Sequence, residues 1–224
     1  MSDLVVESVT VGPFRQNSWV VGDPATREAV LVDPGDEPEA IEALLARLGL
    51  EPRYVLNTHA HLDHVGAVHH FQQTRGLPFH LHPGDREWLE NLPLQGRMFG
   101  LPTSPVPRVD RWIADGETFP IGGRTIEVIH TPGHTPGSCC LFLRDDRVLL
   151  TGDTLFAGSV GRTDFPGGSW AQLERSIRER LFPLGDDVTF FPGHGPASTL
   201  GEERRTNPFV GEAARAGALG KKFV

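Results

Sequence analysis

Four side chains that could bind a metal ion lie within six consecutive positions: His59, His61, Asp63 and His64. Imidazole nitrogen and carboxylate oxygen together form the ligand set of catalytic zinc and of related first-row metals. Structural zinc sites depend mainly on cysteine thiolates, and this chain has only two cysteines. The cluster therefore predicts a catalytic metal site.

Three more candidate ligands lie far along the chain, each among small, turn-forming residues. His134 stands in Thr-Pro-Gly-His-Thr-Pro-Gly, Asp153 in Thr-Gly-Asp-Thr, and His194 in Pro-Gly-His-Gly. A glycine beside a ligand lets the backbone bend sharply and approach an ion closely. We therefore expect these three side chains to complete the site opened by the first cluster.

The first half of the sequence predicts strands followed by helices around the cluster. Apolar, β-branched runs predict strands, and an apolar spacing of three and four residues at 37–48 predicts an amphipathic helix. The cluster lies between a short buried strand and a helix predicted at about 64–74. The expected strands are 4–11, 18–21, 28–33, 54–56 and 78–82.

A second block of predicted strands follows a segment rich in proline and glycine. That segment, 91–108, predicts a long surface loop of the kind that often covers a functional site. Two blocks of strands with their helices predict an α/β fold: a four-layer αββα sandwich of two mixed sheets packed face to face, as one domain over 1–224. The later elements are strands 109–113, 117–120, 124–130, 138–143, 148–151 and 188–191 and helix 170–181.

Composition excludes several classes of protein. A net charge of -8 without basic clusters offers no surface for a phosphate backbone, so no nucleic-acid partner is expected. No apolar run approaches the roughly 18 residues needed to span a bilayer, and no export segment is visible. Cys139 and Cys140 are neighbours and cannot close disulfide-bonded loops, so we expect a cytoplasmic protein.

Taken together, the candidate ligands resemble those of the metallo-β-lactamase fold superfamily, whose H-x-H-x-D-H motif is followed by a distant His, Asp and His. The resemblance covers nearly the whole chain and implies two metal ions. It assigns His59, His61 and His134 to one ion, assigns Asp63, His64 and His194 to the other, and makes Asp153 the bridge.

Within that superfamily the chain is similar to the glyoxalase II group, because Thr-Gly-Asp-Thr-Leu-Phe at 151–156 precedes a glycine-rich loop. The likeness is to a short branch without a C-terminal helical glutathione-binding domain, since 30 residues follow His194. Arg162 occupies the position of a basic residue that contacts glutathione in that group. Asp164 and Pro196 replace two aromatic residues of the same substrate site. We therefore expect a glutathione thioester as substrate, bound through only part of the contacts that the group uses.

This resemblance implies a thioester hydrolase acting on S-lactoylglutathione or a similar small molecule. Two divalent cations can generate hydroxide from a shared water and polarise the carbonyl, and a thiol of pKa about 8.5 leaves without a strong acid. Asp63 is the candidate catalytic residue that orients the water or moves its proton. Zinc is the expected ion, although iron and manganese suit the same ligands. Asp33 and Thr58 are candidates to hold the imidazoles.

The main alternative is a mononuclear iron enzyme similar to persulfide dioxygenases of the same fold. Its iron would be bound by His59, His134 and Asp153, because two His and one carboxylate with open positions suit oxygen activation by Fe(II). A second alternative concerns Arg162, which either contacts substrate or only pairs with Asp164 in a rigid turn. The acyl group, the thiol carrier and the oligomeric state stay open.

Overall fold

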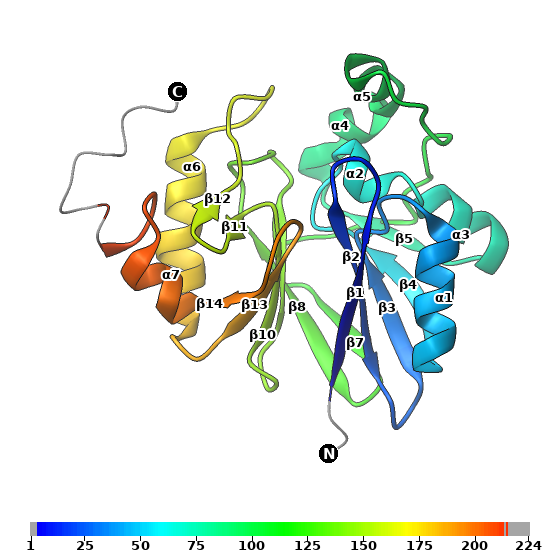
Figure 1. Ribbon diagram of the computed structural model, residues 1–224, viewed down its shortest axis with the longest axis horizontal. Coiled ribbons are helices and arrows are strands. Elements are labelled where there is room, and N and C mark those ends of the chain that lie inside the picture. The colour runs from blue at the N-terminus through cyan, green and yellow to red at the C-terminus, as the bar shows by residue number, and fades with distance from the viewer. Residues whose placement is uncertain (1–3, 213, 215–224) are drawn as a thin grey trace.

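The computed structural model describes residues 4–212 and 214, and it contains two six-stranded sheets (Figure 1). The first sheet has the order β1-β2-β3-β4-β5-β6. Its first three strands are antiparallel, whereas β3 to β6 run parallel. The strands are β1 (Val5–Val11), β2 (Gln16–Asp23), β3 (Glu28–Val32), β4 (Glu51–Leu56), β5 (Phe79–Leu81) and β6 (Arg111–Trp112).

The second sheet has the order β14-β13-β10-β9-β8-β7, and a separate pair of short strands follows β10 in the chain. Only β10 and β13 are parallel within this sheet, so both large sheets are mixed. Its strands are β7 (Thr118–Ile121), β8 (Arg124–His130), β9 (Cys139–Leu143), β10 (Val148–Gly152), β13 (Thr189–Pro192) and β14 (Ser198–Thr199), and the short pair is β11 (Leu155–Phe156) with β12 (Ser159–Val160).

Helices cover the outer face of each sheet, and a further group lies at one end of the molecule (Figure 1). Helices α1 (Pro38–Leu48) and α3 (Val68–Arg75) flank the first sheet. Helix α6 (Trp170–Arg175), the π-helical turn Ser176–Leu181, the 3₁₀ turn Phe182–Leu184 and α7 (Leu200–Thr206) flank the second. The end group consists of α2 (Leu62–Val65), the 3₁₀ turn Pro83–Asp85, α4 (Arg86–Glu90) and α5 (Leu92–Phe99). None of the helices in the described ranges has the length and apolar character needed to cross a membrane.

Alternation along the central strands produces the layers, because successive side chains of a strand point to opposite faces. In β2, Val20 packs in the cluster that contains α1, whereas Val21 packs in the cluster between the sheets. A third cluster joins Phe142 and Phe190 of the second sheet to Leu173 of α6. Three buried layers of side chains between four layers of backbone confirm the predicted αββα sandwich.

The segment 91–108 was predicted to be a loop, and this prediction is wrong for its first half, which forms α5. Pro93 lies in the first turn of α5, where a backbone N–H has no partner within the helix, so proline is tolerated there. Gly96 is buried against Leu101 and Thr103, and Leu92 is also buried. Tertiary burial, which composition does not reveal, stabilises this helix.

Two further predictions about elements need correction. The strand expected at 109–113 was grouped with the second block, but its core forms β6, which pairs with β5 at the edge of the first sheet. The helix expected at 64–74 is two helices, α2 and α3, separated at Gly66 and Ala67. A Cβ at Gly66 would overlap the carbonyl oxygen of Gly35, so the chain passes too close there to carry a side chain.

Candidate metal centre

All seven candidate ligands come together, each in a segment that follows a strand. His59 and His61 lie after β4, and Asp63 and His64 lie in α2 directly behind them. The ligands contributed by the second sheet are His134 after β8, Asp153 after β10 and His194 after β13. Both halves of the fold therefore contribute to one centre.

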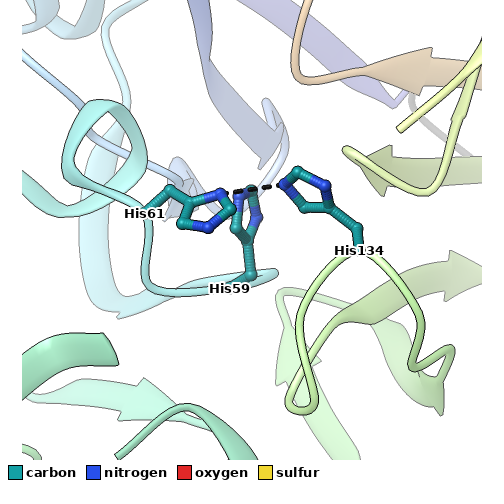
Figure 2. Close-up of side chains that lie close together, drawn as sticks. All are labelled: His59, His61 and His134. Atoms are coloured by element: carbon teal, nitrogen blue, oxygen red, sulfur yellow. Dashed lines mark hydrogen bonds between the residues drawn. The ribbon is translucent and has the colours of Figure 1, made fainter. Parts of the chain in front are cut away.

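The first trio consists of His59, His61 and His134, whose potential ligand atoms all lie within 4.8 Å of one another. Figure 2 shows the three rings facing a common point, with Nε2 of His134 2.9 Å from Nδ1 of His61. Two lone pairs at this distance repel, so a proton or a cation must lie between these nitrogens. Nδ1 of His134 donates to the carbonyl of Arg162 at 2.8 Å, which leaves its Nε2 as the nitrogen that faces the centre.

The second trio consists of Asp63, His64 and His194. Nε2 of His194 lies 3.2 Å from Oδ2 of Asp63, and Nε2 of His64 lies 3.8 Å from the same oxygen. Asp153 lies between the trios, because its Oδ1 is 3.3 Å from Nε2 of His64 and its Oδ2 is 3.5 Å from Nε2 of His134. One carboxylate thus contacts members of both trios.

Unpartnered polar atoms at this centre fit a bound metal ion. Nε2 of His59, His61 and His64 and Oδ1 of Asp153 are buried without a hydrogen-bond partner among the described residues. Buried polar atoms are nearly always paired in folded proteins, because leaving one unpaired costs about 1–3 kcal/mol. A divalent cation would satisfy several of these atoms at once, and nitrogen and oxygen donors suit zinc, iron and manganese.

Protonation states at the centre also suit a cation. Burial and the neighbouring His134 lower the pKa of His61 to about 3, and burial and the other imidazoles lower the pKa of His59 well below its usual value. Burial alone would raise the pKa of Asp153, but His64 holds it well below the ordinary value. At neutral pH the first trio therefore presents neutral imidazoles. Burial alone would lower the pKa of His64 and of His194, but the neighbouring carboxylates raise it, so a cation bound by the second trio would displace protons from these rings.

Asp33 and Thr58, the expected outer contacts, do hold the imidazoles. Oδ2 of Asp33 accepts from Nδ1 of His64 at 2.9 Å and from Oγ1 of Thr58 at 2.6 Å. The backbone N–H of Thr58 donates to Oδ1 of Asp33 at 2.7 Å, and Oγ1 of Thr58 lies 3.0 Å from Nδ1 of His59. Such contacts fix the orientation of a ligand ring and of the nitrogen that faces the metal.

Asp85 connects two of the loops that carry candidate ligands, and sequence reasoning missed it. Its carboxylate accepts from the N–H of Ala60 at 2.9 Å, from the N–H of Gly137 at 2.6 Å and from Oγ1 of Thr135 at 2.8 Å. Burial raises the pKa of Asp85 to about 6. In the sequence it follows Pro83 and Gly84 and resembles an ordinary turn residue, so no local signal distinguishes it.

Gln95 of α5 supports the same ligand loop from the other side. Its Oε1 accepts from the N–H of Leu62 at 2.8 Å, and its Nε2 donates to the carbonyls of Ala60 at 3.1 Å and Trp88 at 2.8 Å. The side chain is buried. Helix α5, whose composition predicted a loop, is therefore hydrogen-bonded directly to the backbone between His61 and Asp63.

The turn that carries His194 is held by the β1–β2 hairpin of the opposite sheet. The N–H of Asn17 donates to the carbonyl of Gly193 at 2.7 Å, and its Nδ2 donates to the carbonyl of Gly195 at 2.9 Å. Nε1 of Trp19 donates to the carbonyl of Pro192 at 3.1 Å. These bonds cross from one half of the sandwich to the other and fix the last candidate ligand.

Two glycines allow close backbone approaches at the centre. A Cβ at Gly35 would overlap the carbonyl oxygen of Asp63, so this position cannot carry a side chain without moving α2. Gly152 has φ of 48°, and a Cβ there would press on Oγ1 of Thr58. Both positions therefore require glycine if the neighbouring ligands are to keep their places.

The centre opens into a pocket of about 200 Å³. Arg162 lines this pocket, but its guanidinium also donates to both oxygens of Asp164 at 2.7 and 2.6 Å and lies 3.9 Å from the ring centroid of Phe165. The turn that pairs Arg162 with Asp164 is thus present in the structure. The complete lining is Phe14, His61, Leu62, Asp63, Trp88, Gln95, Met98, Phe99, His134, Asp153, Arg162, Phe165 and His194.

Three histidines outside the centre have other surroundings. His80 packs against Tyr54 and Phe119 between the sheets, and the ring of His82 stacks on that of His130 at 4.1 Å. Burial, followed by the neighbouring His130, lowers the pKa of His82 to about 4. Nothing in these contacts brings them to the seven candidate ligands.

Comparison with known proteins identifies the family. A sequence profile described as the metallo-beta-lactamase superfamily matches residues 11–194, which include all seven candidate ligands. This chain belongs to the metallo-beta-lactamase superfamily. It is therefore a metal-dependent enzyme of a superfamily of metallo-hydrolases, and both the resemblance and the fold expected from the sequence are confirmed.

Relatives within the superfamily cover nearly the whole chain. The hydroxyacylglutathione hydrolase GloC of Haemophilus influenzae is 40% identical over 207 residues, which are 92% of this chain and 97% of that protein. The human mitochondrial persulfide dioxygenase ETHE1 is 35% identical over 196 residues, 85% of this chain and 70% of its own. The names of these two relatives correspond to the two activities that the sequence analysis considered, hydrolysis of a glutathione thioester and persulfide dioxygenation.

Solved structures of superfamily members agree with this fold. The B3 metallo-beta-lactamase BLEG-1 superimposes with a TM-score of 0.86 at 38% identity, covering 92% of this chain and 99% of that one. TTHA1623, solved in a di-iron-bound form, superimposes with a TM-score of 0.83 at 41% identity, covering 91% and 99%. Both are similar to this chain over almost their full length.

Proposed function

We propose that this member of the superfamily is a thioester hydrolase similar to glyoxalase II, acting on S-lactoylglutathione or a related small thioester. The observation that carries the proposal is the pair of trios, His59-His61-His134 and Asp63-His64-His194, with Asp153 between them. We assign one divalent ion to each trio, with zinc as the expected metal and iron or manganese as substitutes. The similarity to GloC supports the substrate class.

Bound divalent ions would lower the pKa of a water molecule and polarise the thioester carbonyl. Asp63 is the carboxylate that we assign to orient that water and to move its proton, because it lines the pocket and its Oδ2 is held 3.2 Å from Nε2 of His194. No protein nucleophile is needed, since a thiol of pKa about 8.5 leaves as a thiolate near neutral pH.

Arg162 is the residue that we assign to a carboxylate of the thiol carrier, because a guanidinium binds a carboxylate with two parallel hydrogen bonds. In the structure, the carboxylate of Asp164 already accepts two such hydrogen bonds from Arg162. Substrate binding would therefore exchange one carboxylate partner for another, and this exchange makes Arg162 a weaker anchor than an unpaired arginine.

We place the activity in the cytoplasm, where Cys139 and Cys140 would stay reduced as buried thiols.

A persulfide dioxygenase is the second candidate function. The positions of His59, His134 and Asp153 and the 35% identity to ETHE1 favour it. A single iron bound by those three residues would leave the trio Asp63, His64 and His194 without a role. The hydrolase uses both trios, so we prefer it.

Metal content and two activity assays on the purified protein separate these candidates. We expect two ions per chain by elemental analysis and loss of the thioester bond of S-lactoylglutathione. One iron per chain, together with oxygen consumption on glutathione persulfide and no thioester hydrolysis, would contradict the proposal.

A further inference from the structure

We propose that, among thioesters, the protein prefers a substrate that carries a bulky apolar group beside the scissile bond, bound between Phe14 of the β1–β2 turn and Met98 and Phe99 of α5. This inference rests on the proposed thioesterase function and specifies its substrate class. It names contacts at the mouth of the pocket that are separate from the candidate metal ligands. Three observations support it: where exposed apolar side chains gather, how the pocket is lined, and where its charges lie.

Exposed apolar side chains gather at the mouth of the metal pocket. In the described part of the chain, the exposed large hydrophobic residues are confined to the β1–β2 turn and to α5 with the segment after it. Soluble proteins usually expose such residues singly, and a gathered group marks a binding surface. Phe14 at 36% exposure, Met98 at 63% and Phe99 at 44% line the metal pocket, whereas Leu94 at 45% and Val106 at 39% do not.

Phe14 and Phe99 meet across the mouth, with ring centroids 5.1 Å apart and planes at 81°. They come from the hairpin of the first sheet and from the end of α5, so each wall of the mouth contributes one ring. Edge-to-face rings attract each other only weakly, by about 0.5–1.5 kcal/mol beyond their burial. A ligand with its own apolar surface can replace that contact.

Apolar side chains continue from the mouth to the candidate ligands. The ring of Trp88 lies 4.5 Å from that of His61, and the ring of Phe165 lies 5.5 Å from the same imidazole. Trp88 and Phe165 line the same pocket as Phe14 and Phe99. A substrate whose carbonyl reaches the centre therefore places its neighbouring group along a path of aromatic and aliphatic side chains.

Charges in the pocket do not favour a strongly anionic group at this mouth. Arg162 is the arginine in the lining of the described pocket, no lysine lines it, and Asp164 already pairs with this guanidinium. An adjoining cavity of about 290 Å³ shares Phe14, Leu62 and Asp63 and adds Asp36, but its lining among the described residues includes no lysine or arginine. Recognition at the mouth must therefore come mainly from apolar contact.

Burial of one methylene group is worth about a fourfold gain in binding, so lengthening an apolar chain gives a measurable trend. One series extends the acyl group on glutathione from acetyl through butanoyl to hexanoyl. A second series keeps the acetyl group and extends an alkyl chain on a simple thiol. We expect kcat/KM of the metal-loaded protein to rise at least tenfold along one series, and the series that rises identifies which side of the thioester lies at the mouth.

Binding without catalysis provides an independent readout. S-hexylglutathione and S-methylglutathione are thioethers and lack the thioester carbonyl, so calorimetry measures their affinity and no turnover occurs. If kcat/KM rises along the acyl series, octanoate should also bind more tightly than acetate. If kcat/KM stays flat or falls along both series, the inference of an apolar binding site at the mouth is wrong, but the proposed thioesterase function still stands. Failure to cleave any thioester, including S-lactoylglutathione, would overturn the proposed function together with this inference.

Variants test the named contacts. Phe99→Ala and Met98→Ala should lower the ratio of kcat/KM between the longest and shortest substrates at least fivefold, mainly through KM. Leu94→Ala is the matched control, because Leu94 is exposed on the same helix but does not line the pocket. An unchanged ratio in Phe99→Ala, with a change in oligomeric state by light scattering, would overturn the inference and assign the patch to contact between protein chains.

Discussion

Oδ2 of Asp33 lies 2.9 Å from Nδ1 of His64, and both side chains are buried. Because Nδ1 of His64 donates in this pair, Nε2 is the nitrogen that faces Asp63 and Asp153 and that would bind a cation. Thr58 holds Asp33 in place through its N–H and its hydroxyl. The Asp33 carboxylate thus decides which nitrogen His64 presents to Asp63 and Asp153.

Asp33→Ala should weaken metal binding at the trio of Asp63, His64 and His194, because His64 loses the acceptor that orients its ring. Loss of such an outer contact typically costs about 10–100-fold in metal affinity. Competition with a chelator measures the affinity. Asp36→Ala is the control, since Asp36 is exposed three positions later. Equal affinities in the two variants would contradict the role of Asp33.

Asp63→Ala should reduce the metal content from two ions per chain to one and lower thioester turnover about hundredfold or more, because it removes both a ligand and the proposed base. The trio of His59, His61 and His134 should keep its ion. Elemental analysis and steady-state kinetics provide the two measurements. Asp145→Ala, an exposed change between β9 and β10, should alter neither. Full thioester turnover without the second ion would exclude the dinuclear reaction.

Asp85 should make the free energy of unfolding fall as pH rises from about 4 to about 6. Burial raises the pKa of its carboxyl from 3.8 to about 6, so the folded protein holds this proton more tightly than the unfolded chain. Its contribution is therefore complete below pH 4 and is lost as pH rises through 6, by about 3 kcal/mol in total. Urea denaturation of the wild-type protein and of Asp85→Asn, each from pH 4 to pH 7, measures the difference.

In Asp85→Asn this titration is absent, and one of the N–H groups of Ala60 and Gly137 faces an amide NH₂ instead of an oxygen. The variant should therefore lose about 1–3 kcal/mol of stability at pH 4. It should approach or overtake the wild-type protein as the pH rises to 7. A stability difference that does not change with pH would show that Asp85 titrates at its ordinary value.

Removal of metal should lower the melting temperature, because the ligands of the candidate centre come from both halves of the sandwich. An ion present at about 1,000 times its Kd stabilises the folded state by about 4 kcal/mol, which corresponds to about 10 °C for a chain of this size. Scanning calorimetry with and without a chelator tests this expectation. An unchanged melting temperature would mean that the folded protein binds no ion under those conditions.

Local patterns predicted much of the fold and all seven candidate ligands. Apolar, β-branched runs identified the central strands, and the His-rich cluster at 59–64 located the centre, because both signals are contained in short segments. The prediction failed for α5, since Pro93 and Gly96 favour a loop locally whereas burial of Leu92 and Gln95 favours a helix. Asp85 could not be found from the sequence because its three partners lie in distant segments.

Both walls of the pocket mouth are bonded to loops that carry candidate ligands. The hairpin that displays Phe14 holds the turn of His194 through Asn17, and α5, which displays Phe99, holds the loop of His61 through Gln95. Ordering of the mouth and ordering of the metal centre are therefore coupled, and such coupling is reciprocal. If metal loading raises substrate affinity by some factor, bound substrate raises metal affinity by the same factor. A turnover assay at low metal concentration therefore reports metal affinity and substrate affinity together.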